Sequence, residues 1–443
     1  ALGAVWSDPW GALASEPMYP GREGETNGLG RLALFHLALL VTVNVLVCRK
    51  LFFLEFLDHM QSNEGAFIAL ARMLREYPTE TLWWPFWNAG MPYTHTYFPL
   101  LPAASALVAA AGGLTPAAAF HTVCAVFYCL GPVTLYLMAR QLAGSSWTSF
   151  GAALGYSLLS PLALLIPAIR EDVGGLWSAR RLHNLVFYGE SPHVVALTFV
   201  PLAALLLCRA LRGRRIAVLP AGVLVSAVLL ANAFGIATLV VVSVCLLLAE
   251  TDVPWLRRLA VSGGAFALGF SWAAPWIPPS LVESIRMNST TAGGDFRPTA
   301  ASITGGVLLT AAFVTLHFAA RRLRLARHLH FGLLFALAMA GIVLPAFYAE
   351  VHVVPQAKRY QLEFEMAVWL LAAFVAAAVA RRWPRRIKMV AVVMLVGVAA
   401  VQLGQTLRYA AKLIRPHPDV TRTIEYRTAK WFDEHLRGRR VMV

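Results

Sequence analysis

The sequence predicts an all-α polytopic membrane protein, and three observations carry that prediction. Of its 443 residues, 58% are apolar and only 14% are charged, which lies far outside the composition of soluble domains. Long apolar runs recur along the chain, and they are too many for one buried core. Arginine-rich stretches occur at every second connection between these runs, which is the pattern that the positive-inside rule produces.

The predicted architecture has three parts. Residues 1–30 are rich in Gly, Pro, Ser and Glu, and this N-terminal tail lacks the order of a cleavable signal. Residues 31–407 form a transmembrane domain, and residues 408–443 are polar and basic. Because this last part reads as a helix, a Gly turn and the start of a strand, we expect an extracytoplasmic C-terminal domain that continues past Val443.

Runs of spanning length predict a bundle of about 11 transmembrane helices. They lie near residues 33–54, 117–139, 147–168, 194–211, 216–233, 235–249, 259–276, 303–320, 331–349, 364–380 and 387–407. A twelfth run, 97–113, is short and rich in Ala and Gly, and charge alone does not decide whether it crosses the membrane.

The arginine-rich connections indicate which side each loop faces. They are expected on the cytoplasmic side, at Arg140, 209–215, 257–258, 321–327 and 381–388. The loops at 169–193, 277–302 and 350–363, and the chain after 408, then face outward. If the run 97–113 lies in the interface, the N-terminus is cytoplasmic and the first loop also faces outward; if it crosses, that loop is cytoplasmic. We favour the first arrangement, because it gathers the polar loops on one face.

The basic charge and the cysteines are explained by the membrane class. The net charge of +15 is dominated by arginines clustered in short loops, so it is a topology signal and argues against nucleic acid as a partner. All five cysteines lie in or beside apolar runs without metal-ligand spacing. They predict neither a disulfide framework nor a zinc site.

The first outer loop, 55–116, has the composition of a structured layer with interfacial helices. Its first part carries acids and tryptophans together, a mixture that suits neither a membrane span nor a soluble helix. An acid at the water edge of an apolar bundle is an expected position for a base that acts on a lipid-borne substrate. Glu64 and Asp58 are therefore the candidate catalytic residues.

Two further outer loops carry candidate substrate- and phosphate-binding residues. Arginine forks suit phosphate groups, and nearby acids suit deprotonation of a hydroxyl. The candidates are Arg180, Arg181, His183, Tyr188, Glu190 and His193 in the second loop, and Lys358, Arg359 and Tyr360 in the last.

Each candidate also has a plain structural reading. Arg180 and Arg181 suit lipid headgroups at a helix end, and Glu64 suits a pair with Arg72. The histidines suit interfacial hydrogen bonds better than metal ligation. We expect no metal and no cofactor, with Asp172 as the weak candidate for a divalent ion.

The order of elements resembles the GT-C superfamily of integral-membrane glycosyltransferases, whose members include protein O-mannosyltransferases and aminoarabinose transferases. The resemblance rests on SNEGAFIALARML followed by WWPFWNAGMPYTHTYFPLLP after the first membrane run. These enzymes have an Asp-Glu pair early in the first outer loop and a proline-containing segment along the membrane. Asn63 and Glu64 match the pair, and residues 97–102 match the proline segment. Asn63 departs from the pattern, since the usual base in the family is the aspartate.

The segments RLHNLVFYGESPH and QAKRYQLEFEMA are similar to stretches of a bacterial branch labelled as membrane proteins related to 6-pyruvoyl-tetrahydropterin synthase. The resemblance to the GT-C superfamily implies transfer of a sugar from a polyprenyl-phosphate donor to an acceptor in the cell envelope. The expected location is the bacterial cytoplasmic membrane, with a cytoplasmic N-terminus, an extracytoplasmic C-terminus and membrane lipids as partners. The main alternative is a non-catalytic subunit with this fold that binds protein partners in a larger membrane complex. A transporter is a third reading, although the apolar runs hold few ionisable residues.

Overall fold

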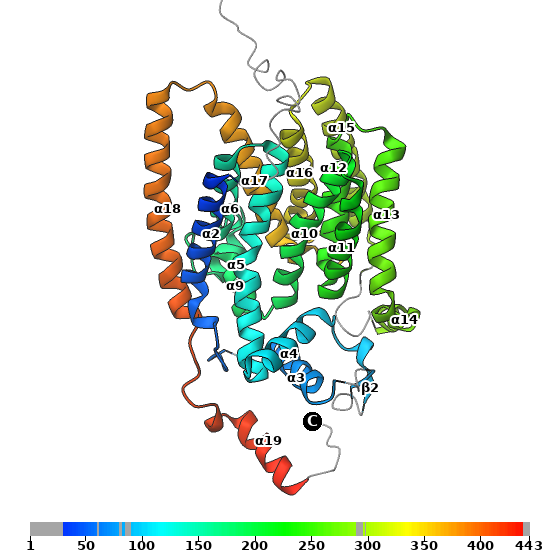
Figure 1. The fold of residues 1–443 in the computed structure, drawn as a ribbon, viewed down its shortest axis with the longest axis vertical. Coiled ribbons are helices and arrows are strands. Elements are labelled where there is room, and N and C mark those ends of the chain that lie inside the picture. The colour runs from blue at the N-terminus through cyan, green and yellow to red at the C-terminus, as the bar shows by residue number, and fades with distance from the viewer. Residues whose placement is uncertain are drawn as a thin grey trace, which may run out of the picture.

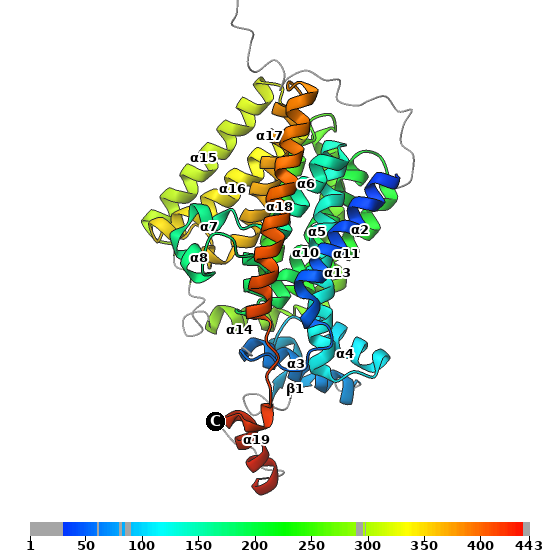
Figure 2. The ribbon, with the colours of Figure 1, turned by 90° about the vertical axis from the view of Figure 1, so that its left-hand side faces the viewer.

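The computed structural model describes residues 30–59, 62–78, 82–84, 90–288, 296 and 298–436. Within these residues the chain is almost entirely helical. One two-stranded antiparallel sheet is formed by β1 (Trp83–Trp84) and β2 (Met91–Pro92). Long helices run side by side as a bundle, and one end of the bundle carries a layer of shorter elements (Figures 1 and 2). The predicted tail before Gly30 and the predicted strand at Arg440 lie outside the described residues.

Each predicted apolar run corresponds to a helix of the bundle. These helices are α2 (Arg31–Cys48), α5 (Pro116–Ala143), α6 (Ser146–Leu158), α10 (Ser191–Leu211), α11 (Val218–Ala231), α12 (Ala233–Ala249), α13 (Trp255–Ala273), α15 (Ala300–Arg322), α16 (Arg327–Tyr348), α17 (Gln361–Ala380) and α18 (Arg385–Leu413). Among the described residues, seven helices are long and apolar enough to cross a membrane: α2, α5, α10, α15, α16, α17 and α18. The prediction of an all-α membrane protein is confirmed, whereas the count of about 11 crossings stays a prediction.

Two predicted runs are shorter as helices than as apolar sequence. The run 147–168 gives α6 up to Leu158, and then the short helices α7 (Leu162–Leu165) and α8 (Pro167–Asp172). Prolines at 161 and 167 cause these breaks, because proline disfavours helical geometry at the residue before it. Asn232 separates α11 from α12 with an extended backbone, and its side chain accepts a hydrogen bond from the amide of Phe234.

The shorter elements gather at one end of the bundle, which we call the loop end. They include η1 (Arg49–Leu51), α3 (Ser62–Glu76), η2 (Tyr93–His95), α4 (Leu100–Gly112), α9 (Arg180–Val186), α14 (Pro279–Asn288), η5 (Ala357–Arg359), η6 (Val420–Arg422) and α19 (Ile424–His435). Helix α4 lies beside α3 beneath the bundle and does not run through it (Figure 1). The run 97–113 therefore belongs to the loop end, as in the arrangement that we favoured.

The C-terminal segment is attached to the first loop. Helix α18 extends to Leu413, beyond the predicted boundary at 407. The next residues pair with the chain after η1: the amide of Asp58 donates to the carbonyl of Arg415 at 2.8 Å, and the amide of His417 donates to the carbonyl of Phe56 at 2.9 Å. This pairing fixes where the C-terminal segment leaves the bundle.

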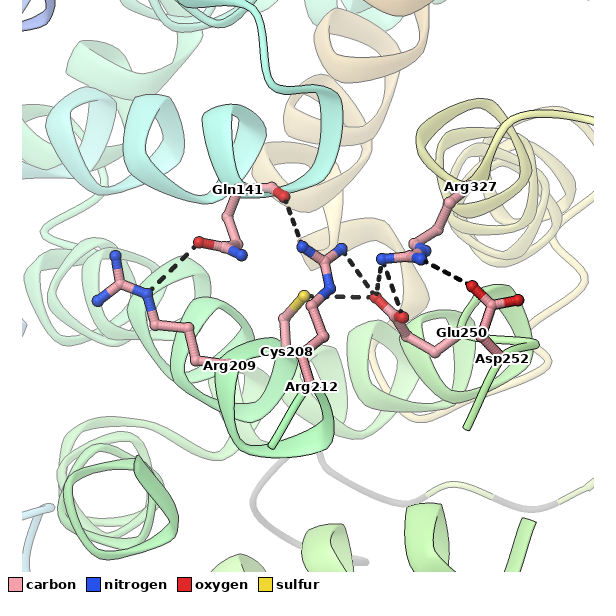
Figure 3. A network of polar contacts seen from close by, with 7 residues as sticks. All are labelled: Gln141, Cys208, Arg209, Arg212, Glu250, Asp252 and Arg327. Carbon is pink, nitrogen blue, oxygen red and sulfur yellow. Dashed lines mark hydrogen bonds and ion pairs between the residues drawn. The ribbon is translucent and has the colours of Figure 1, made fainter. Parts of the chain in front are cut away.

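The opposite end, which we call the arginine end, carries the arginine-rich connections (Figure 1). Here the buried carboxylate of Glu250 lies 3.1 Å from Arg212 and 3.0 Å from Arg327, which also contacts Asp252 at 3.4 Å. The thiol of Cys208 donates to the same carboxylate (Figure 3). Because these residues come from the ends of α10 and α12 and the start of α16, the network joins three helices.

Candidate functional site at the loop end

Asp172 lies at the centre of a cluster of polar side chains. It is the last residue of α8, and the chain turns back after it through Gly174 and Gly175, which both have positive φ. One carboxylate oxygen forms an ion pair with Arg180. The other accepts a hydrogen bond from the Tyr188 hydroxyl at 2.6 Å. The side chain of Asp172 remains 25% exposed, so the group is both held in place and open to a ligand.

The electrostatics of the cluster keep Asp172 charged. Burial works to raise its pKa, but the hydrogen bonds from Tyr188 and Arg180 and the charge of Arg180 outweigh burial, so the pKa lies below its ordinary value. Burial, and then the hydrogen bond to Asp172, raise the pKa of the Tyr188 hydroxyl, which stays a donor. Burial and the charge of Arg180 lower the pKa of His183 to about 4. At neutral pH the cluster therefore holds a carboxylate, an arginine and a neutral imidazole.

Two long helices complete this cluster. The Nε of Arg180 donates to Gln361 at 2.7 Å, and the Gln361 amide donates to the carbonyl of Lys358 at 2.7 Å. His183 Nδ1 forms a hydrogen bond with the hydroxyl of Tyr409, near the end of α18. His183 Nε2 lies 3.6 Å from Asp172, too far for a hydrogen bond. The loop 169–193 is thus fixed against the start of α17 and the end of α18.

Arg359 is the last residue of η5, two positions before Gln361. Its guanidinium is 3.5 Å from the carboxylate of Glu190 and packs over the ring of Phe234, with 5.4 Å to the ring centroid. Half of its side chain is exposed, at 49%. Tyr360 is buried and also packs its ring against Phe234. Arg359 therefore forms one ion pair, with Glu190, and the other half of its side chain is exposed.

Glu363, near the start of α17, is buried together with His193. His193 Nε2 lies 2.8 Å from Glu363, and the Thr238 hydroxyl donates to the same carboxylate oxygen at 2.9 Å. His193 and Glu363 are both almost completely buried. The pair joins α10, α12 and α17, so His193 supports packing next to the cluster and does not face an open surface.

Arg181 points away from its neighbour Arg180 and into the bundle. It is 2% exposed, donates to the carbonyl of Tyr128 and lies 3.9 Å from the centroid of the Tyr128 ring. The ring of Tyr156 lies 5.2 Å away on α6. This environment is that of a desolvated cation held by aromatic faces.

Glu64 forms a buried pair on the other side of the loop end. Its carboxylate lies 2.5 Å from His121 Nε2, and His121 Nδ1 donates to the carbonyls of Leu54 and Ala117 at 2.8 and 3.0 Å. Both side chains are less than 5% exposed. Arg72, the expected partner of Glu64, pairs with Glu76 instead at 2.8 Å.

The Glu64 pair joins α3 to α5, because His121 lies on α5. Asp58 is exposed and pairs through its backbone with the C-terminal segment. The structure therefore pairs Glu64 with a histidine of α5 and leaves the side chain of Asp58 exposed.

Lys358 occupies a separate position. Its ammonium lies 2.6 Å from Glu350, which also lies 3.5 Å from His352, and these groups form a local pair within the loop 350–363. It contributes its carbonyl, rather than its charge, to the Asp172 cluster through Gln361.

Several residues of the cluster carry no local sequence signal. Gln361 and Tyr409 meet Arg180 and His183 across 181 and 226 positions of sequence. Phe234 lies at the start of an apolar helix, where it reads as an ordinary helix residue. Glu363 was detectable as an acid at the start of an apolar run, although its partner His193 was not. His121 was detectable as a titratable residue inside an apolar run, which is costly without a partner.

The arrangement of the described side chains offers no metal site. Across residues 30–436, apart from the short stretches that the structure does not describe, no group of three or more His, Cys, Asp or Glu side chains is placed to hold a metal ion. Asp172 has an arginine, a tyrosine and a histidine as neighbours, which is not a ligand set for a divalent cation. The prediction that the protein needs no metal stays a prediction.

These features define a class: a polytopic helical membrane protein with a structured layer of loops at one end. No family model and no curated protein sequence matches the chain. Among solved structures, the oligosaccharyltransferase AglB from Archaeoglobus fulgidus, in complex with an inhibitory peptide and a dolichol-phosphate, is similar with a TM-score of 0.53 and 14% sequence identity. The apo crystal structure of the oligosaccharyltransferase from that organism gives 0.49 at 14% identity, which is too low to argue from.

The first likeness covers 91% of this chain and 58% of AglB, so the chain spans somewhat over half the length of that enzyme. AglB is a GT-C glycosyltransferase, and the likeness shows a fold of the GT-C kind. Membership of the bacterial branch named after the pterin synthase stays a prediction.

Proposed function

We propose that this protein is a membrane glycosyltransferase that moves a sugar from a polyprenyl-phosphate donor to an acceptor outside the cytoplasmic membrane. The observation that carries the proposal is the Asp172 cluster: a partly exposed carboxylate held by Arg180, whose other partner, Gln361, is two residues from the half-exposed Arg359. The GT-C-like fold supports it, and so does the peptide and dolichol-phosphate complex of the structural neighbour AglB.

In the proposed reaction the phosphate of the donor lies on Arg359, whose outer side is free. An arginine binds phosphate through two parallel hydrogen bonds and stabilises the charge that the leaving phosphate gains. The acceptor hydroxyl attacks the anomeric carbon, a new carbon–oxygen bond forms, and the bond to the phosphate oxygen breaks. The electron pair of that bond leaves with the lipid phosphate.

Asp172 faces the acceptor in this scheme. Its lowered pKa keeps the carboxylate ionised before the reaction. As the new bond forms, the carboxylate takes the proton of the acceptor hydroxyl, and its negative charge lies near the oxocarbenium-like sugar of the transition state. Arg180 and Tyr188 hold the carboxylate in that orientation. Glu64 is the second candidate for proton acceptor, and it would have to leave His121 to reach a substrate.

The orientation follows from the same proposal. The loop end faces outward, the arginine end and the N-terminus face the cytoplasm, and about eleven helices cross a bacterial cytoplasmic membrane. This places the arginines where the positive-inside rule expects them.

The experiment uses membranes that contain the full chain and radiolabelled polyprenyl-phosphate monosaccharides, with label counted in cell-envelope acceptors. We expect Asp172→Asn to lower transfer by about 100-fold or more, because it removes the charge that acts in the transition state. Glu171→Gln, an exposed acid next to it, is the matched control and is expected to stay within twofold.

Two other outcomes separate the alternatives. Loss of transfer in Glu64→Gln with normal transfer in Asp172→Asn assigns the reaction to Glu64. Equal transfer by the wild type, both variants and membranes without the protein contradicts a catalytic role. That last result favours a non-catalytic subunit in a membrane complex.

A further inference from the structure

A groove lies between the ends of α2 and α18 at the loop end. Its volume is about 100 Å³, well above the roughly 10–15 Å³ that one water molecule needs on the same measure. Its apolar lining consists of Leu46, Val47, Leu407, Ala410, Ala411 and Ile414. These dimensions and this lining suit a section of one hydrocarbon chain.

Two basic side chains also line the groove. Arg49 and Lys50 follow directly after the last residue of α2, in the short helix η1, and both are exposed. In the part of the chain that the structure describes, neither pairs with a carboxylate. The apolar slot is next to the two cations, in the same order as the acyl chain and the phosphate of a lipid.

Helix α18 has little protein around it. It stands on the outside of the bundle next to α2 (Figure 1), and only 6% of its most apolar window is buried. Gln402 holds its middle by donating to the carbonyls of Leu158 and Trp177 at 2.7 and 2.8 Å. Nearer the loop end, small residues, Ala410 and Ala411, leave the slot beside α2 open.

We propose that this groove binds an anionic glycerophospholipid of the surrounding bilayer, with one acyl chain in the slot and the phosphate on Arg49 and Lys50. The lipid supplies the contacts that hold the end of α18 against α2. Tyr409 lies on this part of α18 and hydrogen-bonds His183, so the lipid also fixes one wall of the Asp172 cluster. The binding site is separate from Arg359 and does not depend on the proposed transferase activity.

The test uses the full protein in detergent, stripped of lipid and then exposed to vesicles of phosphatidylglycerol or of phosphatidylcholine. Retained lipid is counted by native mass spectrometry, and Tm is measured in parallel. We expect the wild type to keep one phosphatidylglycerol and to gain thermal stability from it but not from phosphatidylcholine.

Two variants address the two halves of the site. Arg49→Gln with Lys50→Gln removes the phosphate contacts and is expected to lower retention at least tenfold. Ala411→Trp fills the slot, keeps both charges and is expected to lower retention as strongly. Arg385→Gln with Arg386→Gln, a basic pair at the other end of α18, is the matched control and is expected to retain lipid.

The proposal is overturned if both basic pairs lower retention equally, which indicates general attraction to charged lipid. It is also overturned if Ala411→Trp retains lipid, or if phosphatidylcholine stabilises the protein equally. Displacement of phosphatidylglycerol by an equimolar polyprenyl phosphate assigns the groove to the donor lipid instead.

Discussion

The two ends of the molecule each place a carboxylate against arginine, but the surroundings differ. At the arginine end, Glu250 has no exposed surface and is shared by Arg212 and Arg327, which come from different helices (Figure 3). At the loop end, Asp172 keeps a quarter of its side chain exposed and is held by Arg180 alone among the described arginines. The same chemical pair therefore serves packing at one end and remains open to a ligand at the other.

The elements that carry the two pairs differ in the same way. Glu250 and its partners lie at the ends of long helices, so the pair fixes how these helices meet. Asp172 and Arg180 lie on short elements, α8 and α9, joined through two glycines at positive φ. A short irregular element positions a side chain at a surface without making the bundle depend on it.

The largest effect is expected from Glu250→Gln. Removing the carboxylate breaks a buried ion pair that two arginines share, which costs about 3–5 kcal/mol. Thermal unfolding of the purified protein measures this loss. Asp252→Asn is the control: its side chain is 44% exposed, and its ion pair is worth about 0–1 kcal/mol. A Tm of Glu250→Gln equal to that of Asp252→Asn would show that the network does not hold the bundle.

A smaller effect is expected from Arg359→Gln, which removes the proposed phosphate contact. The KM for the polyprenyl-phosphate sugar should rise about tenfold, equivalent to about 1.4 kcal/mol of binding, with little change in Tm. Lys358→Gln is the neighbouring control, because Lys358 pairs with Glu350 away from Asp172. If both variants raise KM equally, general positive charge and not the position of Arg359 explains donor binding.

The smallest effect concerns pH. The pKa of His183 falls to about 4 on folding, so between pH 6.5 and about 4 the unfolded chain binds a proton that the folded chain does not. Stability is therefore lost as pH falls through this window. Asp172, whose pKa is also lowered, loses its contribution at still lower pH.

The Tm of the wild type should drop by more than that of His183→Gln between pH 7.5 and pH 5. Equal drops in the two proteins would mean that His183 does not carry the acid sensitivity.

Much of this arrangement follows from local sequence. Apolar runs predict the helices of the bundle, and the arginine-rich connections predict which helix ends lie together. The charged loops predict that Glu64, Arg180 and Arg359 share one end. The run 147–168 was predicted as one span, and the structure breaks it at Pro161 and Pro167, because proline disfavours helical geometry at the residue before it.

The pairing of side chains was not predictable in the same way. Arg180 and Arg181 are adjacent and look equivalent, yet one reaches Asp172 and the other is buried against Tyr128. Successive residues of a helix point about 100° apart, so packing alone decides which of them faces inward. Glu64 likewise pairs with His121, because α3 packs against α5 and turns Glu64 toward it. Arg72, on the same helix, pairs with Glu76 instead.

The most direct test of the account compares Asp172→Asn and Glu250→Gln for sugar transfer per folded molecule, with folded protein counted by size-exclusion chromatography. The account predicts that Asp172→Asn loses transfer at least 100-fold with an almost unchanged Tm. It predicts that Glu250→Gln has a lowered Tm but transfers normally per folded molecule. Normal transfer by folded Asp172→Asn, together with loss of transfer by folded Glu250→Gln, would contradict it.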